Sequence, residues 1–190
     1  ISMDAAMYVG VGISKFLAGI AFTLGLVLVI LGGAELFTGN SLVFLALYSK
    51  RISFKDMLHN WTTVYLGNFI GSLILAYIIY QTGLYAMNAS SLGLYSLNIA
   101  YGKVNLTFSQ AFYRGIVCNW LVCLAVWLAA SAEDTTGKIM ACVFPIAAFV
   151  GSGFEHSVAN MYFIAVGIFL KGVPSLVSQS GLGLADLNWY

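Results

Sequence analysis

A single histidine lies in the middle of a long apolar stretch of the sequence. His156 directly follows Glu155, and the nearest other charged residues are Lys138 and Lys171. Ionisable side chains inside a bilayer are costly and usually functional. Because imidazole titrates near neutral pH, His156 could donate a proton or a hydrogen bond to a passing weak-acid anion. The alternative is a core histidine whose ring is satisfied by the adjacent backbone.

Two glutamates recur at corresponding places in the chain. Glu35 and Glu155 each lie near the centre of an apolar stretch. A carboxylate that faced a path for anions would repel them. We therefore interpret both glutamates as structural groups that cap free backbone N–H groups where a helix is interrupted. A proton relay is the alternative role.

Three uncharged polar residues and one lysine complete the set of candidates. Thr38, Asn119 and Asn160 could hydrogen-bond a solute or join neighbouring helices. We expect Thr38 to line the path, and both roles stay open for the two asparagines. Lys103 could draw anions toward an outer mouth, or it could be an ordinary solvated charge.

The amino-acid composition indicates whether these residues lie in water or in a membrane. The 190 residues are 61% hydrophobic and only 8% charged, whereas a soluble domain carries about 25% charged residues. So few charges cannot cover a surface in water, and the chain is predicted to be an all-α integral membrane protein. The net charge of +1 gives no indication of a nucleic-acid partner, and none is expected. The three cysteines form no C-x-x-C pair and are read as packing residues, so neither a metal site nor a cofactor is expected.

The sparse charges mark the ends of the membrane spans. Residues 15–50 and 138–171 would each form a straight helix of roughly 50 Å, but the hydrocarbon core is only about 30 Å thick. A helix broken near its middle resolves the mismatch. Two plain spans are predicted from about Met57 to Gln81 and from about Phe108 to Ala130, separated by a loop over residues 82–107.

Basic residues in short loops predict the orientation. Lys50, Arg51 and Lys55 cluster after the first broken span, so the Lys50–Asp56 loop is expected to be cytoplasmic. The 82–107 loop then lies outside. On this orientation the two broken spans run in opposite directions.

The two predicted breaks also share a short motif. Residues 33–40 read GAELFTGN and residues 153–160 read GFEHSVAN, so that each has G-x-E with an asparagine five residues after the glutamate. Interrupted helices in corresponding positions of two halves indicate an inverted repeat and a solute path. We predict one transmembrane domain over residues 1–190, with a first repeat of about 1–81 and a second of about 108–190. A complete repeat has three plus three helices, so most of a first helix and a sixth helix are expected beyond this stretch.

Three segments resemble signature segments of the formate/nitrite transporter family. They are residues 33–40, residues 119–127 (NWLVCLAVW) and residues 153–161 (GFEHSVANM). The resemblance implies an aquaporin-like fold, a homopentamer with one pore in each protomer, and a prokaryotic inner membrane. It implies a channel for small monovalent anions of weak acids, namely formate, nitrite or hydrosulfide, and no enzymatic activity. We lean toward hydrosulfide.

The resemblance also assigns roles to individual residues. His156 matches a central pore histidine and Thr38 a threonine that faces it, while Lys103 and Asn119 match residues near the outer vestibule and pore. Spacing alone favours ordinary packing for five apolar residues near the breaks, but the resemblance implies two constrictions. The inner one is formed by Leu26, Leu36 and Phe37, and the outer one by Phe22 and Phe149.

Two other functional classes are alternatives for a helical membrane protein with a buried histidine. A neutral-solute channel, such as a water or glycerol pore, shares the inverted repeat, but such pores typically use paired Asn-Pro-Ala breaks, and neither break here contains proline. A haem-binding redox subunit needs axial ligands on facing helices. The only histidines are His59 and His156, and His59 lies beside the expected cytoplasmic loop.

Overall fold

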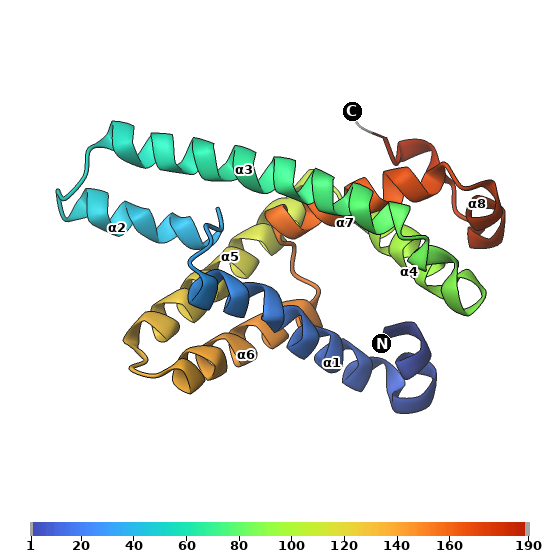
Figure 1. Ribbon diagram of the computed structural model, residues 1–190, viewed down its shortest axis with the longest axis horizontal. Coiled ribbons are helices and arrows are strands. Elements are labelled where there is room, and N and C mark those ends of the chain that lie inside the picture. The colour runs from blue at the N-terminus through green and yellow to red at the C-terminus, as the bar shows by residue number, and fades with distance from the viewer. Residues whose placement is uncertain (1, 189–190) are drawn as a thin grey trace. The chain divides into compact units, whose positions relative to one another are not determined.

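The computed structural model describes residues 2–188, and the side chains of all of these except 2–9 and 186. These residues form helices and connecting turns and contain no strand. Figure 1 shows their arrangement. The α-helices are α1 (Ser2–Gly32), α2 (Val43–Tyr48), α3 (Phe54–Gln81), α4 (Met87–Val104), α5 (Phe108–Ser131), α6 (Thr135–Ser152), α7 (Ser157–Lys171) and α8 (Pro174–Ser180), and the short 3₁₀ helices are η1 (Gly39–Leu42), η2 (Leu84–Ala86) and η3 (Leu184–Asp186).

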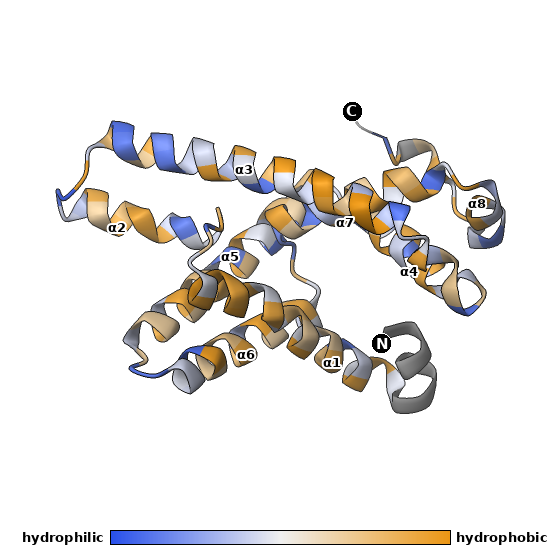
Figure 2. Cartoon of the chain, viewed as in Figure 1, coloured by the Kyte–Doolittle hydropathy of each residue, from blue (hydrophilic) through white to orange (hydrophobic). Residues whose placement is uncertain are grey.

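Among the described residues, four helical segments are long and apolar enough to cross a membrane. They are Gly10–Gly32 of α1, and the whole of α3, α5 and α6. Apolar residues run along these helices, and polar residues gather at the turns between α2 and α3 and between α5 and α6 (Figure 2). The class of an all-α membrane protein is therefore confirmed. The two plain spans predicted from the sequence correspond to α3 and α5.

Both predicted helix breaks are present. The first separates the end of α1 at Gly32 from η1, which begins at Gly39, and the second separates the end of α6 at Ser152 from α7, which begins at Ser157. By length and composition α6 could also cross on its own. A further bend of 105° separates α7 from α8.

Side-chain caps fix the starts of the helices that follow the polar turns. The Ser53 backbone N–H donates to Asp56 Oδ2 at 2.9 Å, and the Asp56 N–H donates back to Ser53 Oγ at 3.2 Å. This reciprocal pair satisfies N–H groups that the first turn of α3 leaves free. At the start of α6, Asp134 Oδ1 accepts the Gly137 N–H at 2.9 Å. Both helices therefore begin beside short polar turns.

The helices group into two compact units. The first comprises residues 2–66 and 112–156, and α1 packs against α6 within it. The two helices run in opposite directions, as the predicted inversion requires (Figure 1). They approach so closely at Gly19 that a Cβ there would lie 2.8 Å from the Cα of Ala147. Glycine is required at this crossing because the obstructing atoms belong to the backbone.

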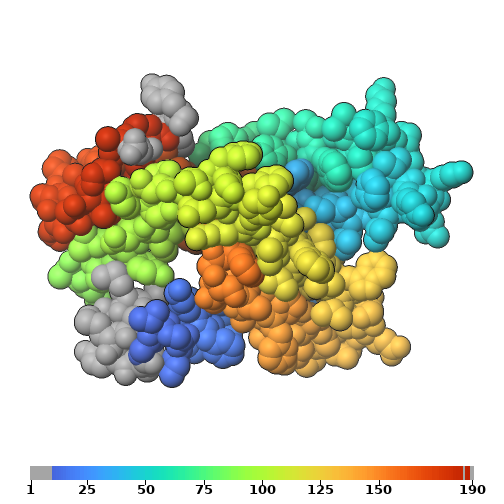
Figure 3. Space-filling model, turned by 180° about the vertical axis from the view of Figure 1, so that it is seen from behind, coloured from blue at the N-terminus to red at the C-terminus, as the bar shows by residue number. Residues whose placement is uncertain are grey.

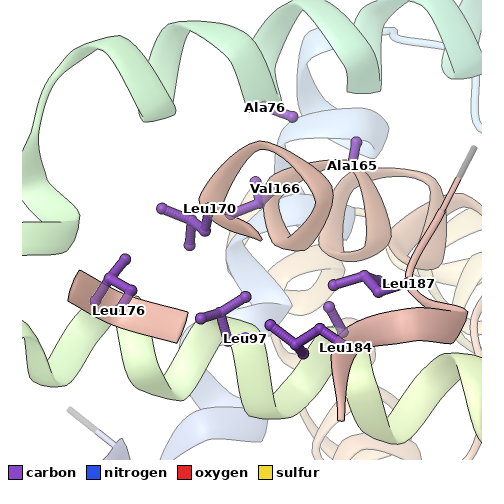
Figure 4. Packing of buried hydrophobic residues seen from close by; sticks show 9 residues of the cluster. Ala76, Leu97, Ala165, Val166, Leu170, Leu176, Leu184 and Leu187 are labelled. Carbon is purple, nitrogen blue, oxygen red and sulfur yellow. The ribbon is translucent and has the colours of Figure 1, made fainter. Parts of the chain in front are cut away.

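The second unit comprises residues 67–111 and 157–188. Here α4 packs against α7 and α8, and seen from behind, the C-terminal residues lie against α4 (Figure 3). Leu97, Leu170, Leu176 and Leu187 are among the buried residues of its core (Figure 4). A Cβ at Gly167 would lie 2.2 Å from the Cβ of Ala100, so α4 and α7 are also in close contact.

One expectation from the sequence is wrong. The 82–107 segment was predicted to be a loop, but most of it forms α4. Its Gly, Asn and Ser residues favour turns, and Asn88, Ala89 and Ser90 do adopt positive φ near its start. Packing of Gly93, Leu97 and Ala100 against the rest of the unit overrides this local preference.

Candidate functional site

The two helix breaks have the same backbone conformation. Gly33 and Gly153 follow the last helical turns with φ values of 71° and 75°, in the left-handed region that favours glycine. One residue later, the Ala34 N–H donates to the Val29 carbonyl at 3.0 Å, and the Phe154 N–H donates to the Phe149 carbonyl at 3.1 Å. This bond from a residue to the fifth before it closes each helix end. The three residues after each glycine have no regular structure, and they lead into a turn in the first break and directly into α7 in the second.

The first unit brings the two breaks together at one hydrogen bond. Thr38 Oγ1 and His156 Nε2 lie 3.0 Å apart, and which atom donates depends on the imidazole tautomer. Both side chains are buried, with exposed fractions of 5% and 7%. A buried histidine paired with a hydroxyl can exchange a hydrogen bond with a third polar group that reaches the pair.

Aromatic rings cover the histidine on one side. The Phe149 ring stacks on the His156 ring with centroids 5.8 Å apart and an interplanar angle of 25°. Phe22 meets Phe149 edge to face, also at 5.8 Å. Phe22, Leu26, Leu36 and Phe149 belong to one apolar cluster. Phe37, assigned to the inner constriction by resemblance, instead packs on the Tyr65 ring of α3 at 5.0 Å.

Helix α3 holds the segment that follows the first break. Asn40 Nδ2 donates both to Glu35 Oε2 and to Asn60 Oδ1, the latter at 3.0 Å. Trp61 Nε1 donates to the Asn40 carbonyl at 2.9 Å. Glu35 therefore bonds across its own break to Asn40, the asparagine of the repeated motif. Its role as a cap on free backbone N–H groups stays a prediction.

Helix α5 holds the same segment through other residues. Asn119 Nδ2 donates to Ser41 Oγ at 3.1 Å. The Cys123 thiol donates to the Thr38 carbonyl at 3.7 Å. Helix α5 thus contacts the 38–41 segment at both ends, and the amide of Asn119 bonds to Ser41. The place of Asn119 in a solute path stays a prediction.

A cavity of about 380 Å³ lies beside the first break. Its walls include the apolar side chains of Leu26 and Leu36 and the polar groups of Glu35, Asn40 and Lys138. The Lys138 ammonium in this concave wall attracts anions, while the Glu35 carboxylate that shares the wall carries the opposite charge. The cavity joins this cation to the apolar residues that were expected to form the inner constriction.

The remaining predicted site residues lie elsewhere in the fold. Lys103 is in the last turn of α4, and Asn160 is in the first turn of α7. Both are half-buried members of the second unit. Glu155 is buried beside His156. The roles of these three residues in a solute path stay predictions.

Three residues that form or contact the 38–41 segment were not predicted from the sequence as site residues. Ser41 and Asn60 were not singled out, and Cys123 was read as a packing residue. The position of Cys123 four residues after Asn119 was a usable signal, because residues i and i+4 share a helix face. Nothing in the sequence indicated which groups on other segments would meet that face.

The fold and the site define a class of helical membrane protein in which two interrupted helices meet at a buried polar pair. A sequence model described as formate/nitrite transporter matches residues 1–190, and the chain belongs to this family. The chain is 46% identical over 177 residues to a probable formate transporter of Methanothermobacter thermautotrophicus, with 85% of this chain and 64% of the relative covered. It is 40% identical over 184 residues to the formate channel FocA of Haemophilus influenzae, with 94% and 65% covered.

Solved structures show the same fold. A pentameric formate channel with formate bound has a TM-score of 0.86 and 44% identity, covering 94% of this chain and 72% of that one. A structure described as an FNT family ion channel has a TM-score of 0.74 and 32% identity, covering 88% and 69%. The chain spans less than two thirds of the length of the two curated relatives above.

Proposed function

We propose that the protein is a transmembrane channel for small monovalent anions of weak acids, with formate as the first candidate. The observation that carries this proposal is the buried hydrogen bond between Thr38 and His156 at the meeting point of two broken helices. Two similar proteins are described as formate channels or transporters. Passage of nitrite and the preference for hydrosulfide remain predictions for the same assay.

The mechanism follows from the cost of moving a charge past apolar groups. An anion that leaves water for a ring of Phe and Leu side chains loses hydration that these groups cannot replace. When His156 Nε2 donates to Thr38 Oγ1, the threonine hydroxyl hydrogen is free to donate to an anion in the path. A protonated His156 can also give its proton to the anion, so that the solute crosses the apolar residues as a neutral acid.

The other site residues have supporting roles in this proposal. Lys103 attracts anions at the outer mouth, and Asn160 offers an amide near the second break. Phe22 and Phe149 form the outer constriction and Leu26, Leu36 and Phe37 the inner one. The Phe37 ring packs on Tyr65, so its place in the inner constriction depends on its position next to Leu36 in the sequence.

We also propose the setting in which the channel works. Lys50 and Arg51 are exposed in the turn before α3, and Lys55 is exposed in the first turn of that helix. Basic residues in such short connections remain in the cytoplasm. The Lys50–Asp56 turn would then face the cytoplasm of a prokaryotic inner membrane. Assembly as a homopentamer is supported by the likeness to a channel described as pentameric.

Anion flux into proteoliposomes tests the proposed function. Formate, nitrite, hydrosulfide and chloride are compared across pH with the full-length protein, and empty liposomes are subtracted because neutral weak acids cross bare bilayers. We expect passage of weak-acid anions that rises as pH falls, with little chloride flux. Water permeability without flux of any anion would overturn the proposal in favour of a neutral-solute channel.

A further inference from the structure

Three residues of α5 contact the segment that carries Thr38. Asn119, Cys123 and Val126 are spaced four and three residues apart and therefore lie on one helix face. Asn119 meets Ser41, and Cys123 meets the Thr38 carbonyl. A Cβ at Gly39 would lie 3.4 Å from Val126 Cγ2, so the backbone between those two points also lies close to α5.

The polar contacts form one continuous chain. The amide nitrogen of Asn119 lies 3.1 Å from Ser41 Oγ and 3.8 Å from Cys123 Sγ. The thiol in turn lies 3.7 Å from the Thr38 carbonyl oxygen. This chain joins the two ends of the 38–41 segment through α5. The 38–41 segment is held there just before α2 begins at Val43.

The position of the Thr38 hydroxyl depends on this anchoring. Threonine has a single χ1 torsion with few staggered rotamers, so in a given rotamer the backbone of Thr38 determines where Oγ1 lies. The residues before Thr38 belong to the helix break and lack the regular bonds of a helix. Contacts from neighbouring helices must therefore supply the rigidity.

We propose that the α5 face formed by Asn119, Cys123 and Val126 is a positioning surface that holds Thr38 against His156. On this assignment Asn119 acts through Ser41, in place of the contact with solute that the sequence left open. The inference rests on the proposed function, since it concerns the group that would meet the anion. It adds Ser41 and Cys123 as positioning residues.

A double-mutant cycle on Ser41 and Asn119 separates the two roles of Asn119. Formate flux and its pH profile are measured for Ser41→Ala, Asn119→Ala and the double variant in proteoliposomes. We expect each single change to lower flux roughly fivefold, the effect of one hydrogen bond, and to shift the pH profile in the same direction. The double variant should be no worse than either single variant. Loss of flux in Asn119→Ala with an unaltered Ser41→Ala would overturn the inference and make Asn119 a solute-binding residue.

Cysteine variants test the contact between Cys123 and the Thr38 carbonyl. Cys123→Ala should shift the pH profile, and Cys123→Ser, which keeps a donor, should restore it in large part. Cys142→Ala is the matched control, because its buried thiol donates to the Lys138 carbonyl in α6. Its pH profile should match the wild type even where its melting temperature falls. If the wild type conducts formate and all three cysteine variants have its pH profile, the positioning role alone is wrong. If the wild type conducts no anion, the proposed function is wrong as well.

Discussion

Thr38 Oγ1 and His156 Nε2 form a buried 3.0 Å hydrogen bond although 118 residues separate them in the sequence. Each residue follows a glycine that ends a helix in the left-handed conformation. The interrupted backbone is what allows a side chain from each half to reach the other. In an unbroken helix, the same residues would be presented on a cylindrical surface with their backbone groups already paired.

Replacing the histidine should remove the pH response of the channel. His156→Gln keeps a hydrogen-bonding side chain of similar reach but cannot titrate. We expect flux of formate that no longer rises as pH falls, measured in proteoliposomes at fixed formate concentration. His59→Gln is the control, since that residue lies near the start of α3. A His156→Gln profile that followed the wild type at every pH would rule out the proton-donor role.

Removing the threonine hydroxyl should affect both stability and transport. Thr38→Val has nearly the same shape but leaves His156 Nε2 without its 3.0 Å partner. The expected cost is about 1–3 kcal/mol of unfolding free energy, together with loss of formate flux. Thr38→Ser keeps the hydroxyl and should retain both properties in large part. Thermal melting in detergent and the flux assay provide the two measurements, and indistinguishable Val and Ser variants would contradict the prediction.

The Asn40 amide should be a measurable stabiliser of the first break. It donates to Glu35 and to Asn60, so Asn60→Ala removes one of its acceptors. We expect a loss of about 1 kcal/mol. Asn98→Ala is the comparison, because the Asn98 amide bonds only locally to the Leu94 carbonyl four residues earlier. Equal melting temperatures for Asn60→Ala and the wild type would show that the contact contributes nothing.

The α1–α6 crossing should reject a single methyl group. A Cβ at Gly19 meets backbone atoms of Ala147 at 2.8 and 3.0 Å, so Gly19→Ala should lower stability by about 1–3 kcal/mol. Gly25→Ala lies on the same helix with nothing within 4 Å of its Cβ. That control should be neutral or slightly stabilising, since alanine favours helix over glycine. Melting temperatures in detergent decide the comparison, and a Gly19→Ala variant as stable as Gly25→Ala would contradict it.

The lysine in the cavity wall should assist anions that enter beside the first break. Lys138→Gln removes this cation while keeping a polar side chain. We expect formate flux to fall roughly twofold to tenfold at low ionic strength and to approach the wild type as salt screens the charge. Lys55→Gln removes a charge from the first turn of α3, outside the cavity wall. Equal losses in both variants, or a loss that salt leaves unchanged, would count against a specific role for Lys138.

The breaks could be predicted because their causes are local. Glycine at residues 33 and 153, and charge spacing too long for one straight span, are both visible in the sequence. The meeting of Thr38 with His156 was implied by the family resemblance. The inversion was also predictable, and α1 and α6 do run in opposite directions.

The contacts made by α5 could not be predicted. A membrane helix is apolar on its lipid-facing side as well as on its packed side, so hydrophobic periodicity does not reveal its rotation. Cys123 and Leu124 are both hydrophobic, yet Cys123 reaches the Thr38 carbonyl while Leu124 is exposed. Helix α4 was missed for the opposite reason, because its polar residues concealed an apolar face that only packing reveals.

The matching backbones of the two breaks carry different side chains at the same place. The third residue after the glycine is Leu36 in one half and His156 in the other. The backbone arrangement is therefore repeated, while the histidine occurs once. On the proposed function, a solute that travels in one direction meets His156 and Leu36 in the opposite order from a solute that travels the other way. The duplicated frame thus has a built-in chemical polarity, which a pair of identical halves would lack.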